Sequence, residues 1–375
     1  MNVLAVNCGS STLKFALFEA TNGELTRISH GKREVPSGGH AVAAKAMLDE
    51  LRAAGRPIDA VGHRVVHGGE RFRTAVRVDD AVLGDIRAMS ELAPLHNGPA
   101  LDAMAAIREG LGSEVPMVAC FDTAFHRTMP DRASHYAIDV ALARKHGVYR
   151  YGFHGLAHRS MTERYAALSG KPAAEARLIT VQLGAGCSIA AIDRGRSIDT
   201  SMGFTPLEGM VMATRSGDID PAAVGYIARR EGVLEAEVLG WLNTRSGLLG
   251  LSGVSADMRE LLEIERRDDE RAALAIDMFC YRVRKYIGAY VAALGGADAV
   301  VFGGGIGERS PEVRSRICAE LQWLGLTLEE GRNEAGEEGR ISAGNSRVAA
   351  YIARVDEERI VAADTIAILT GRPEA

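Results

Sequence analysis

The chain lacks the features that define several large classes of protein. It has only five cysteines in 375 residues, and they are scattered, odd in number and without a CxxC pair. We therefore predict reduced thiols, and neither a disulfide framework nor a zinc site. No apolar run approaches the roughly 20 residues that cross a bilayer. No basic stretch precedes an apolar one at the N-terminus, which predicts no secretion signal, no membrane partner and a cytoplasmic location.

Basic excess and the familiar nucleotide motifs are missing as well. A net charge of -5 and a pI near 6.1 argue against a nucleic-acid partner. No GxxxxGK[ST] string and no HRD or DFG set occurs, which excludes a P-loop ATPase and a protein kinase. The string GGGIG at 303–307 is too compact for GxGxxG, which weakens a Rossmann interpretation. A phosphate binder of this sequence must use hairpins and strand–turn–helix junctions.

The composition is that of a globular protein, with 47% apolar and 25% charged residues, and the length predicts two domains. Short β-type runs alternate with helical segments, which is the α/β pattern. An apolar stripe within 271–294 predicts a long helix, followed by a buried strand at 299–302 and a turn at 303–307. Ser310, Pro311 and Glu312 then open another helix. The polar, glycine-rich segment 331–347 predicts a surface loop.

Two stretches far apart in the sequence follow one plan. Residues 3–18, VLAVNCGSSTLKFALF, and 178–192, LITVQLGAGCSIAAI, each read as strand, Gly/Ser turn and strand. Gly9-Ser10-Ser11 corresponds in this alignment to Gly186-Cys187-Ser188, which places Cys187 at the second tip. Such a tip exposes backbone N–H groups that can hold phosphate. Two related lobes that grip a polyphosphate are therefore expected, as in an ATP-using enzyme.

Two arginines stand in glycine-flanked segments. Arg64, in GHRVVHGG, lies among valines, where a guanidinium is costly to desolvate unless it meets a carboxylate or phosphate. His63 and His67 would form a metal pair only on a helix, whereas the valines favour a strand. Arg215, in TRSGDID, is the second arginine. The alternative is that it only pairs with Asp218 or Asp220.

Other polar residues follow apolar runs. Asp122 comes after the run 115–120, where ligands gather in α/β folds, although a helix N-cap is the alternative. His154 lies between glycines in YGFHG, so its ring can approach a ligand closely. Asn7 could orient a magnesium-bound water and Lys14 could reach a phosphate, or Lys14 could be a surface lysine. Two such arginines and two phosphate hairpins match the requirements of phosphoryl transfer.

These strings, in order, closely resemble the acetate kinase family, within the acetate and sugar kinase/Hsp70/actin superfamily. The resemblance covers nearly the whole chain and rests on VNCGSSTLKF, GHRVVHGGE, APLHN, FDTAFHRTMP, YGFHG, TSMGFTPLEG, TRSGDIDP, SGVSADMREL, GGGIGE and VDEER. It implies a homodimeric enzyme that interconverts ATP plus acetate with ADP plus acetyl phosphate, with Mg²⁺ as cofactor and Mn²⁺ as a substitute. It also implies an α/β fold of two ribonuclease-H-like lobes, the actin-like ATPase fold, with the active site in the cleft between them. The expected lobes are 1–126, rejoined by a helix near 360–375, and the nucleotide-binding lobe 127–359.

The resemblance implies roles for single residues. Arg64 and Arg215 match the arginines that hold the acyl carboxylate and the transferring phosphoryl group. Asp122 matches an orienting or acid–base carboxylate, and His154 a transition-state stabiliser. The small acyl pocket is implied at Arg64, Val66, Leu95 and Pro206.

Nucleotide and metal contacts are implied in the same way. The ATP contacts are Lys14, Gln182, Leu183, Gly184, Ala185, Gly186, Asp257, Met258, Arg259, Gly305, Ile306, Gly307, Glu308 and Arg309. The metal ligands are Asn7 and Glu357, with Glu358 as the alternative to Glu357, because the string reads VDEE where the family usually has TNEE.

One further departure bears on the phosphoryl donor. The family usually has LGNGSS where this chain has LGAGCS, so Ala185 supplies no side-chain amide. A lost hydrogen bond to a charged phosphate costs roughly 1–3 kcal/mol. Pyrophosphate therefore remains a possible donor beside ATP. The acceptor could equally be propionate or another short-chain acid, or the fold could serve as an actin/Hsp70-like nucleotide-binding module without acyl chemistry.

Overall fold

The computed structural model describes residues 1–9, 11–36, 38–91 and 94–371. For residues 91 and 94–96 it describes the backbone but not the side chains. The chain divides into two compact units. Unit 1 comprises Met1–Arg127, Phe153–Leu156 and Asp356–Ala375, and unit 2 comprises Thr128–Gly152 and Ala157–Val355. Among the described residues, no helix combines the length and the apolar character needed to cross a membrane.

Unit 1 is built on a six-stranded mixed sheet of order β3-β2-β1-β4-β6-β5. Strands β1, β4 and β6 are parallel, whereas β2, β3 and β5 are antiparallel to their neighbours. The strands are β1 (Asn2–Cys8), β2 (Thr12–Thr21), β3 (Glu24–Glu34), β4 (Ala60–Val65), β5 (Val76–Arg77) and β6 (Met117–Phe121). The helices are α1 (His40–Ala53), α2 (Asp80–Ala88), α3 (Pro94–Leu111) and α15 (Glu357–Thr370), with 3-10 turns η1 (Met89–Glu91) and η2 (Asp122–Thr128).

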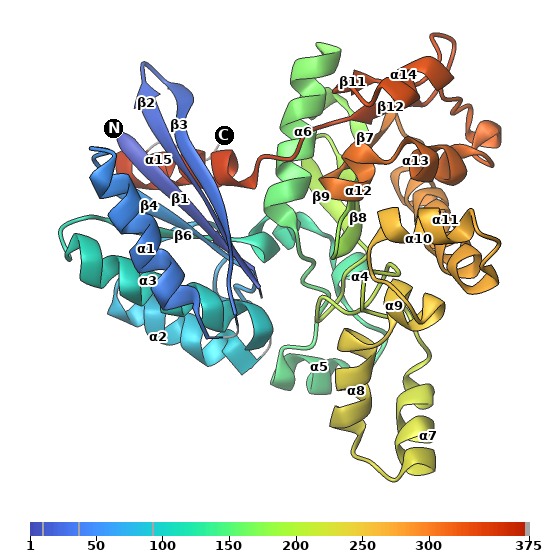
Figure 1. Ribbon diagram of the computed structural model, residues 1–375, viewed down its shortest axis with the longest axis horizontal. Helices are drawn as coiled ribbons and strands as arrows, with labels where there is room; N and C mark the ends of the chain where they lie inside the picture. The colour runs from blue at the N-terminus through green and yellow to red at the C-terminus, as the bar shows by residue number, and fades with distance from the viewer. Residues whose placement is uncertain (10, 37, 92–93, 372–375) are drawn as a thin grey trace. The chain divides into compact units, whose positions relative to one another are not determined.

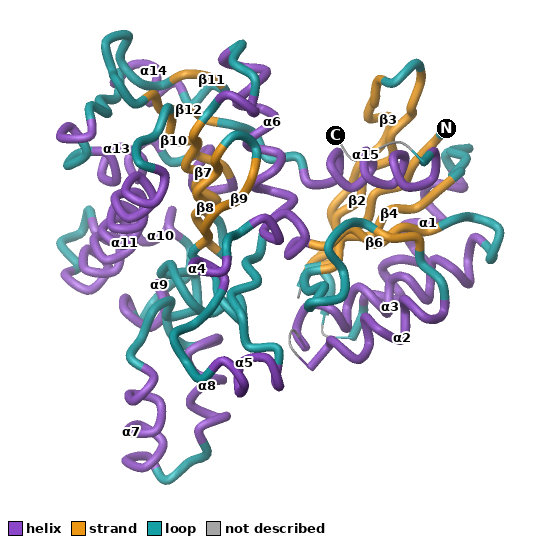
Figure 2. Tube along the Cα trace, turned by 180° about the vertical axis from the view of Figure 1, so that it is seen from behind, coloured by secondary structure: helices purple, strands orange, loops and turns teal. Residues whose placement is uncertain are grey.

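Alternation along β1 separates the two layers of the unit 1 core. Leu4 and Val6 pack into a buried cluster with α1 and α3. Val3 and Ala5 point to the other face and pack against α15. Figures 1 and 2 both show α15, red in Figure 1, beside the blue β1 although the two are far apart in sequence. The sheet is thus covered on both faces, which is why residues 3–6 of β1 are all apolar.

Unit 2 repeats this sheet with the order β11-β12-β10-β7-β8-β9 and the same strand directions. Its strands are β7 (Arg177–Leu183), β8 (Cys187–Asp193), β9 (Arg196–Thr200), β10 (Ala299–Gly303), β11 (Gly339–Arg340) and β12 (Ala349–Ile352). Its helices are α4 (Asp131–Ser134), α5 (Val140–His146), α6 (Gly155–Ser169), α7 (Pro221–Glu231), α8 (Glu235–Thr244), α9 (Gly247–Ser252), α10 (Met258–Glu265), α11 (Glu270–Leu294), α12 (Gly304–Arg309), α13 (Pro311–Cys318) and α14 (Glu330–Ala335), with 3-10 turns η3 (Ala173–Glu175) and η4 (Gln322–Leu324). Figures 1 and 2 show the sheet between α6 and α11.

The strand register makes the internal repeat quantitative. The β2–β3 ladder shifts register between Leu17 and Phe18, and the β8–β9 ladder shifts at the corresponding place, between Ala191 and Ile192. The hairpin tips differ, since residues 9–12 separate β1 from the first paired residue of β2, whereas residues 184–186 separate β7 from β8. The repeat predicted from the sequence is therefore confirmed, with one residue fewer at the second tip.

Three of the predicted elements of unit 2 are confirmed and two are wrong. The predicted strand 299–302 is β10. The long helix is α11, and Ser310 caps α13 by accepting from Val313 N. Segment 303–307 is not a turn, because the chain passes at once from β10 into the short helix α12. Segment 331–347 is not a plain loop either, since it contains part of α14 and all of β11. The glycines and charged residues of this segment give no local sign of these elements, because tertiary contacts stabilise them.

Candidate active site

Polar side chains gather in unit 1 where the parallel strands end. Asn7 and Arg64 pair across β1 and β4 one residue before each strand ends, and Asp122 directly follows β6. Arg64 Nε donates to Asp122 Oδ1 at 2.9 Å and Nη2 donates to Oδ2 at 2.6 Å, while Nη1 donates to Asn7 Oδ1 at 2.9 Å. Both forks of the guanidinium are therefore fixed before any ligand arrives. The carboxyl-end rule for α/β folds predicted such a position for Asp122 from the sequence, and the structure adds Asn7 and Arg64 beside it.

Charge and burial depend on each other in this cluster. Asp122 is fully buried and the Arg64 side chain is 12% exposed. Burial by itself lowers the pKa of Arg64, but the Asp122 and Glu357 carboxylates outweigh that effect and raise it above its usual range. The Asp122 carboxylate accepts from Arg64 and from His154 N at 3.2 Å. The N-cap alternative for Asp122 is therefore wrong, since its oxygens bind the guanidinium and a distant backbone N–H.

His154 is held in an unusual backbone conformation. Its φ is +57°, in the left-handed region that non-glycine residues rarely adopt, and Gly152 has φ +75°. A Cβ on Gly155 would stand 1.9 Å from the carbonyl oxygen of Asp122. The glycines of YGFHG thus permit a tight turn and a close approach to Asp122. The turn fixes the backbone position from which the His154 side chain extends.

An amide and two carboxylates lie beside Arg64. Asn7 Nδ2 donates to Glu357 Oε2 at 2.7 Å and to Glu358 Oε1 at 3.2 Å. Both glutamates lie in the first turn of α15, and Lys14 pairs with Asn7 across β1 and β2. Burial and the neighbouring Glu357 charge raise the pKa of Glu358. The two carboxylates thus repel each other, and a cation between them would relieve that repulsion.

This oxygen set fits a magnesium site. Mg²⁺ takes one or two carboxylates, keeps several waters and completes its shell with phosphate oxygens. Asn7 with Glu357 or Glu358 provides that partial set. The described part of the chain contains no cluster of three or more His, Cys, Asp and Glu side chains arranged for a metal. The remaining ligands here would therefore be water and phosphate.

The segment after β4 is fixed by two residues whose roles the sequence did not reveal. Asn97 Oδ1 accepts from His67 N at 3.1 Å, and its Nδ2 donates to His67 O at 3.0 Å. Thr123 Oγ1 accepts from Gly68 N at 3.0 Å. Val66 is buried next to these contacts. Leu95 lies in the first turn of α3, but its side chain is outside the described residues.

The second hairpin in unit 2 has a different tip from the one expected. Cys187 is not at the tip but is the first residue of β8, paired with Leu183 and fully buried. Its Sγ donates to Gly184 O at 3.2 Å, and burial raises the pKa of the thiol to about 12. The thiol is therefore an inert structural group. Ala185 O accepts from Ala213 N at 3.1 Å, which ties the tip to the segment that precedes Arg215.

A pocket of about 680 Å³ opens in unit 2 beside this tip. It collects residues from three predicted ATP segments, namely Gly184, Ala185, Asp257, Met258, Arg259, Gly305, Ile306 and Arg309. It also collects residues that the sequence did not predict as ATP contacts, namely Ala213, Ala256, Leu262, Glu263, Arg266, Ser310, Pro311 and Glu312. Spacing could have revealed Leu262 and Arg266, because they follow Met258 by four and eight residues on α10 and so share its face.

Several predicted ATP contacts lie outside the lining of this pocket. They are Gln182, Leu183, Gly186, Gly307 and Glu308 in unit 2 and Lys14 in unit 1. Glu308 has a structural task, since its Oε1 accepts from Gly304 N and from Val355 N, each at 3.1 Å. Gln182 packs against the β10–α12 turn, where a Cβ on Gly304 would stand 2.8 Å from Nε2.

A buried arginine stabilises α12, the helix that contributes Gly305, Ile306 and Arg309 to the pocket. Arg314 is fully buried on α13, and its Nη1 donates to Gly307 O at 2.9 Å and Glu308 O at 3.0 Å. Its remaining donors bind Asn333 Oδ1 at 2.7 Å and Asn333 O at 2.6 Å. Arg314 therefore joins α12 to α14 and explains why the segment after residue 330 is ordered.

Arg215 is held differently from Arg64. Its Nη1 donates to Pro206 O at 3.1 Å and lies 3.7 Å from Met212 Sδ. Within the described ranges no carboxylate pairs with it, and burial lowers its pKa. Asp218 binds Gly209 N and Tyr286 instead, and Asp220 caps α7. The alternative that Arg215 serves Asp218 or Asp220 is therefore wrong.

These features match known proteins along the whole chain. The family model described as the Acetokinase family matches residues 2–363. The chain belongs to the acetokinase family. It is 45% identical to an acetate kinase of Solibacter usitatus, over all of this chain and 99% of that one. It is 44% identical to an acetate kinase of Bacillus subtilis, over 97% of this chain and 98% of the second protein.

Solved structures of acetokinase relatives have the same two-domain architecture. An acetate kinase of Porphyromonas gingivalis superimposes with a TM-score of 0.88 at 38% identity, covering 98% of this chain and 99% of that one. A propionate kinase of Francisella tularensis superimposes with a TM-score of 0.89 at 36% identity, covering 97% and 98%. The predicted actin-like ATPase fold is confirmed. This acetokinase-family member is a kinase with a carboxylate acceptor.

Proposed function

We propose that this chain catalyses the reversible, magnesium-dependent transfer of the ATP γ-phosphoryl group to acetate, giving acetyl phosphate and ADP. The observation that carries the proposal is Arg215, a guanidinium largely removed from water that has no carboxylate partner among the described residues. Such a cation is stable only if an anion completes its environment. Its position beside Pro206 suits a small carboxylate or a phosphoryl group.

The chemistry requires alignment and charge neutralisation more than proton transfer. An acetate oxygen forms the new bond to the γ-phosphorus while the bond to the ADP oxygen breaks and ADP leaves with the electron pair. Acetate is already an anion at neutral pH, so no general base is needed. Asp122 therefore acts by holding Arg64 through two hydrogen bonds, as an orienting group.

The negative charge on the transferring phosphoryl group and on the nucleotide phosphates must also be neutralised. Arg64 and Arg215 neutralise oxygens of the transferring group, and His154 donates to an equatorial oxygen. Asn7 and Glu357 would hold a magnesium ion, which would neutralise charge on the nucleotide phosphates.

The pocket in unit 2 favours a nucleotide over pyrophosphate as donor. Its volume of about 680 Å³ lies within the usual range for small-molecule sites. Met258, Leu262 and Ile306 give it an apolar lining that a bare pyrophosphate would not need. Mn²⁺ in place of Mg²⁺, a homodimeric state and a cytoplasmic location complete the proposal, on the strength of the family resemblance.

Ala185 gives a direct test of donor binding. The family usually has asparagine there, and Ala185 lines the pocket. Ala185→Asn adds a side-chain amide and should lower the KM for ATP by about 5- to 150-fold, because one hydrogen bond to phosphate contributes about 1–3 kcal/mol. The KM for acetate should stay the same. Steady-state kinetics check this, and an unchanged or raised KM for ATP contradicts it.

Acyl-phosphate trapping with hydroxylamine tests the proposed reaction. Acetate, propionate and butyrate are each supplied with ATP and with pyrophosphate. We expect hydroxamate with ATP, the highest kcat/KM for acetate, and a preference over propionate of roughly tenfold, since one methylene contributes about 1–3 kcal/mol. A preference for propionate moves the assignment to a propionate kinase, as the Francisella tularensis structure is titled. Absence of hydroxamate with every pair refutes the proposal.

A further inference from the structure

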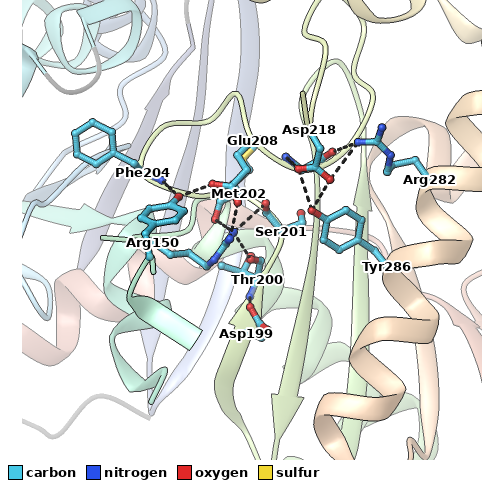
Figure 3. Close-up of polar contacts among 12 residues, drawn as sticks. Arg150, Asp199, Thr200, Ser201, Met202, Phe204, Glu208, Asp218, Arg282 and Tyr286 are labelled. Carbon is cyan, nitrogen blue, oxygen red and sulfur yellow. Dashed lines mark hydrogen bonds and ion pairs between the residues drawn. The ribbon is translucent and has the colours of Figure 1, made fainter. Parts of the chain in front are cut away.

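A partly buried ion pair holds the loop that carries Pro206 and Arg215. Arg150 Nη2 contacts Glu208 Oε1 at 2.5 Å, and the two side chains are 18% and 31% exposed. Arg150 Nη1 also donates to three consecutive carbonyls, those of Thr200, Ser201 and Met202, at 3.1, 3.2 and 3.3 Å. Figure 3 shows the guanidinium enclosed by these acceptors. One arginine thus holds both ends of the segment that turns between residues 200 and 208.

Tyr136 completes this arrangement, which we call the Glu208 brace (Arg150, Tyr136 and Glu208). Its hydroxyl donates to Glu208 Oε2 and accepts from Phe204 N at 2.8 Å. Arg150 also stacks over the Tyr136 ring, with 5.5 Å from Cζ to the centroid. A Cβ on Gly203 would stand 1.7 Å from Glu208 Oε2, so the carboxylate occupies the space that the glycine leaves. The brace is a built feature of this loop and not a surface ion pair.

A second set of contacts fixes the residue after Glu208. Asp218 Oδ1 accepts from Gly209 N at 2.9 Å, and Asp218 also binds Tyr286 and Arg282 of α11. Arg282 Nη1 donates to Gly209 O at 2.9 Å. Figure 3 shows Asp218 between Tyr286 and Arg282, both on the long helix. Gly209 is therefore anchored to α11 while Glu208 is anchored to Arg150.

The two anchored residues, Glu208 and Gly209, closely follow Pro206, the residue that binds Arg215. Pro206 lies two residues before Glu208, and its carbonyl is the oxygen atom that accepts from Arg215 Nη1, at 3.1 Å. The backbone around Arg215 is fixed separately, since Arg215 O accepts from Met212 N and Leu248 N donates to Met212 O. The guanidinium itself is thus oriented through Pro206, and Pro206 is oriented through the Glu208 brace.

We propose that Glu208, held by Arg150 and Tyr136, is a positioning residue that sets the direction of the Arg215 guanidinium. The inference rests on the proposed role of Arg215 in carboxylate phosphorylation. Arg215 lacks a carboxylate of its own among the described residues, so nothing but Pro206 O and Met212 Sδ directs it before substrate binds. A small displacement of a group that stabilises the transition state has large kinetic effects.

The test compares Glu208→Gln with Glu338→Gln. Glu338 is a matched control, because it also forms a partly buried ion pair, with Arg164 at 2.5 Å, and lies in the same unit. We expect Glu208→Gln to lower kcat/KM for acetate by about tenfold or more, with the KM for ATP changed less than about twofold. Glu338→Gln should leave both unchanged, and the two variants should have similar melting temperatures. Equal acetate kinetics in the two variants would overturn the inference.

A second variant covers a folding failure of Glu208→Gln. Tyr136→Phe keeps the ring under Arg150 and removes only the hydroxyl that binds Glu208 and Phe204 N. It should lower kcat/KM for acetate in the same direction by about threefold. If Tyr136→Phe melts like the parent and has the acetate kinetics of Glu338→Gln, the brace has no positioning role.

A double-mutant cycle with Arg215→Lys separates positioning from general stability. If Glu208 acts through Arg215, Glu208→Gln should lose most of its effect when Arg215 is already lysine, so the two changes are not additive. Full additivity of the two changes would overturn the inference. Failure of the proposed function gives a different result, because the parent protein itself would then form no acetyl hydroxamate.

Discussion

Arg64 and Arg215 carry the same charge but lie in contrasting environments. This contrast suits them to different roles in the proposed phosphoryl transfer. Arg64 is neutralised by Asp122 and fixed at three hydrogen bonds. Arg215 has one carbonyl and one thioether sulfur as partners. Arg64 is therefore pre-oriented, whereas Arg215 has further N–H groups that can donate to an incoming anion.

Truncation of either arginine should abolish most of the activity. By analogy with arginine fingers, Arg64→Ala and Arg215→Ala should each lower kcat by about 10³-fold. Arg64→Ala should also destabilise the fold, because it leaves the fully buried Asp122 carboxylate without its partner. Turnover at saturating ATP and acetate, together with melting temperatures, checks both statements. Near-normal turnover in both variants would refute the assigned roles.

His63 predicts how stability responds to acid. It is buried on β4, its Nε2 has no hydrogen-bond partner among the residues that the structure describes, and burial lowers its pKa to about 3. The unfolded chain, with a histidine pKa near 6.5, binds a proton that the folded chain does not bind between these two values. Stability from this group is therefore complete above about pH 6.5 and decreases as the pH falls toward 3.

His63→Asn should remove that dependence. Between pH 7 and pH 5 the parent should lose about 2 kcal/mol of unfolding free energy through this one group, and the variant should not. Guanidinium denaturation at the two pH values measures the difference. Equal pH dependence in the parent and the variant would show that His63 does not stay neutral in the folded protein.

The packing of α15 on β4 depends on one glycine. A Cβ on Gly62 would stand 2.2 Å from Thr365 Oγ1 and 2.6 Å from Val361 Cγ1, both on α15. Gly62→Ala should therefore separate helix and strand and lower the free energy of unfolding by about 1–3 kcal/mol.

Gly84 provides the control for this prediction. It lies inside α2, is exposed, and a Cβ there would meet no atom within 4 Å. Gly84→Ala should raise stability by about 0.5–1 kcal/mol, since alanine is the better helix former. Melting temperatures of the two variants should shift in opposite directions. A Gly62→Ala variant as stable as the parent would contradict the packing argument.

Local patterns predicted the elements whose stability is local. The stripe along α11 and the Ser310 cap of α13 are visible in the sequence because periodicity and capping involve neighbouring residues. Helix α14 was missed because the contact that holds it comes from Arg314, which is far outside the segment. Cys187 was misplaced because the alignment of two strands does not reveal that one tip is a residue shorter.

The candidate site shows the same division. The carboxyl-end rule located Asp122 after a buried strand, whereas the strand pairing seen in the structure brings Asn7 and Arg64 beside it. Asn97 was not recognised, because its amide binds a backbone segment thirty residues away. The full pocket lining required the three-dimensional contact between the β7–β8 tip, α10 and α12.

The whole molecule is a duplicated fold with divided chemistry. Asn7 and Gln182 occupy equivalent strand positions, and so do their neighbours Arg64 and Gly303. The position that carries a charged arginine in unit 1 thus carries, in unit 2, the glycine that ends β10 before α12. Unit 1 contains the charged cluster and its oxygen ligands, and unit 2 contains the pocket of about 680 Å³ and Arg215.

Phosphorus NMR of the full chain with ATP and acetate tests the central claim most directly. With Mg²⁺ present, the acetyl phosphate and ADP signals should grow together in equal amounts, and excess EDTA should stop both. Without acetate, ATP should persist, because the proposed reaction then lacks its acceptor. Growth of ADP with inorganic phosphate but no acetyl phosphate would contradict the claim and indicate nucleotide hydrolysis without acyl chemistry.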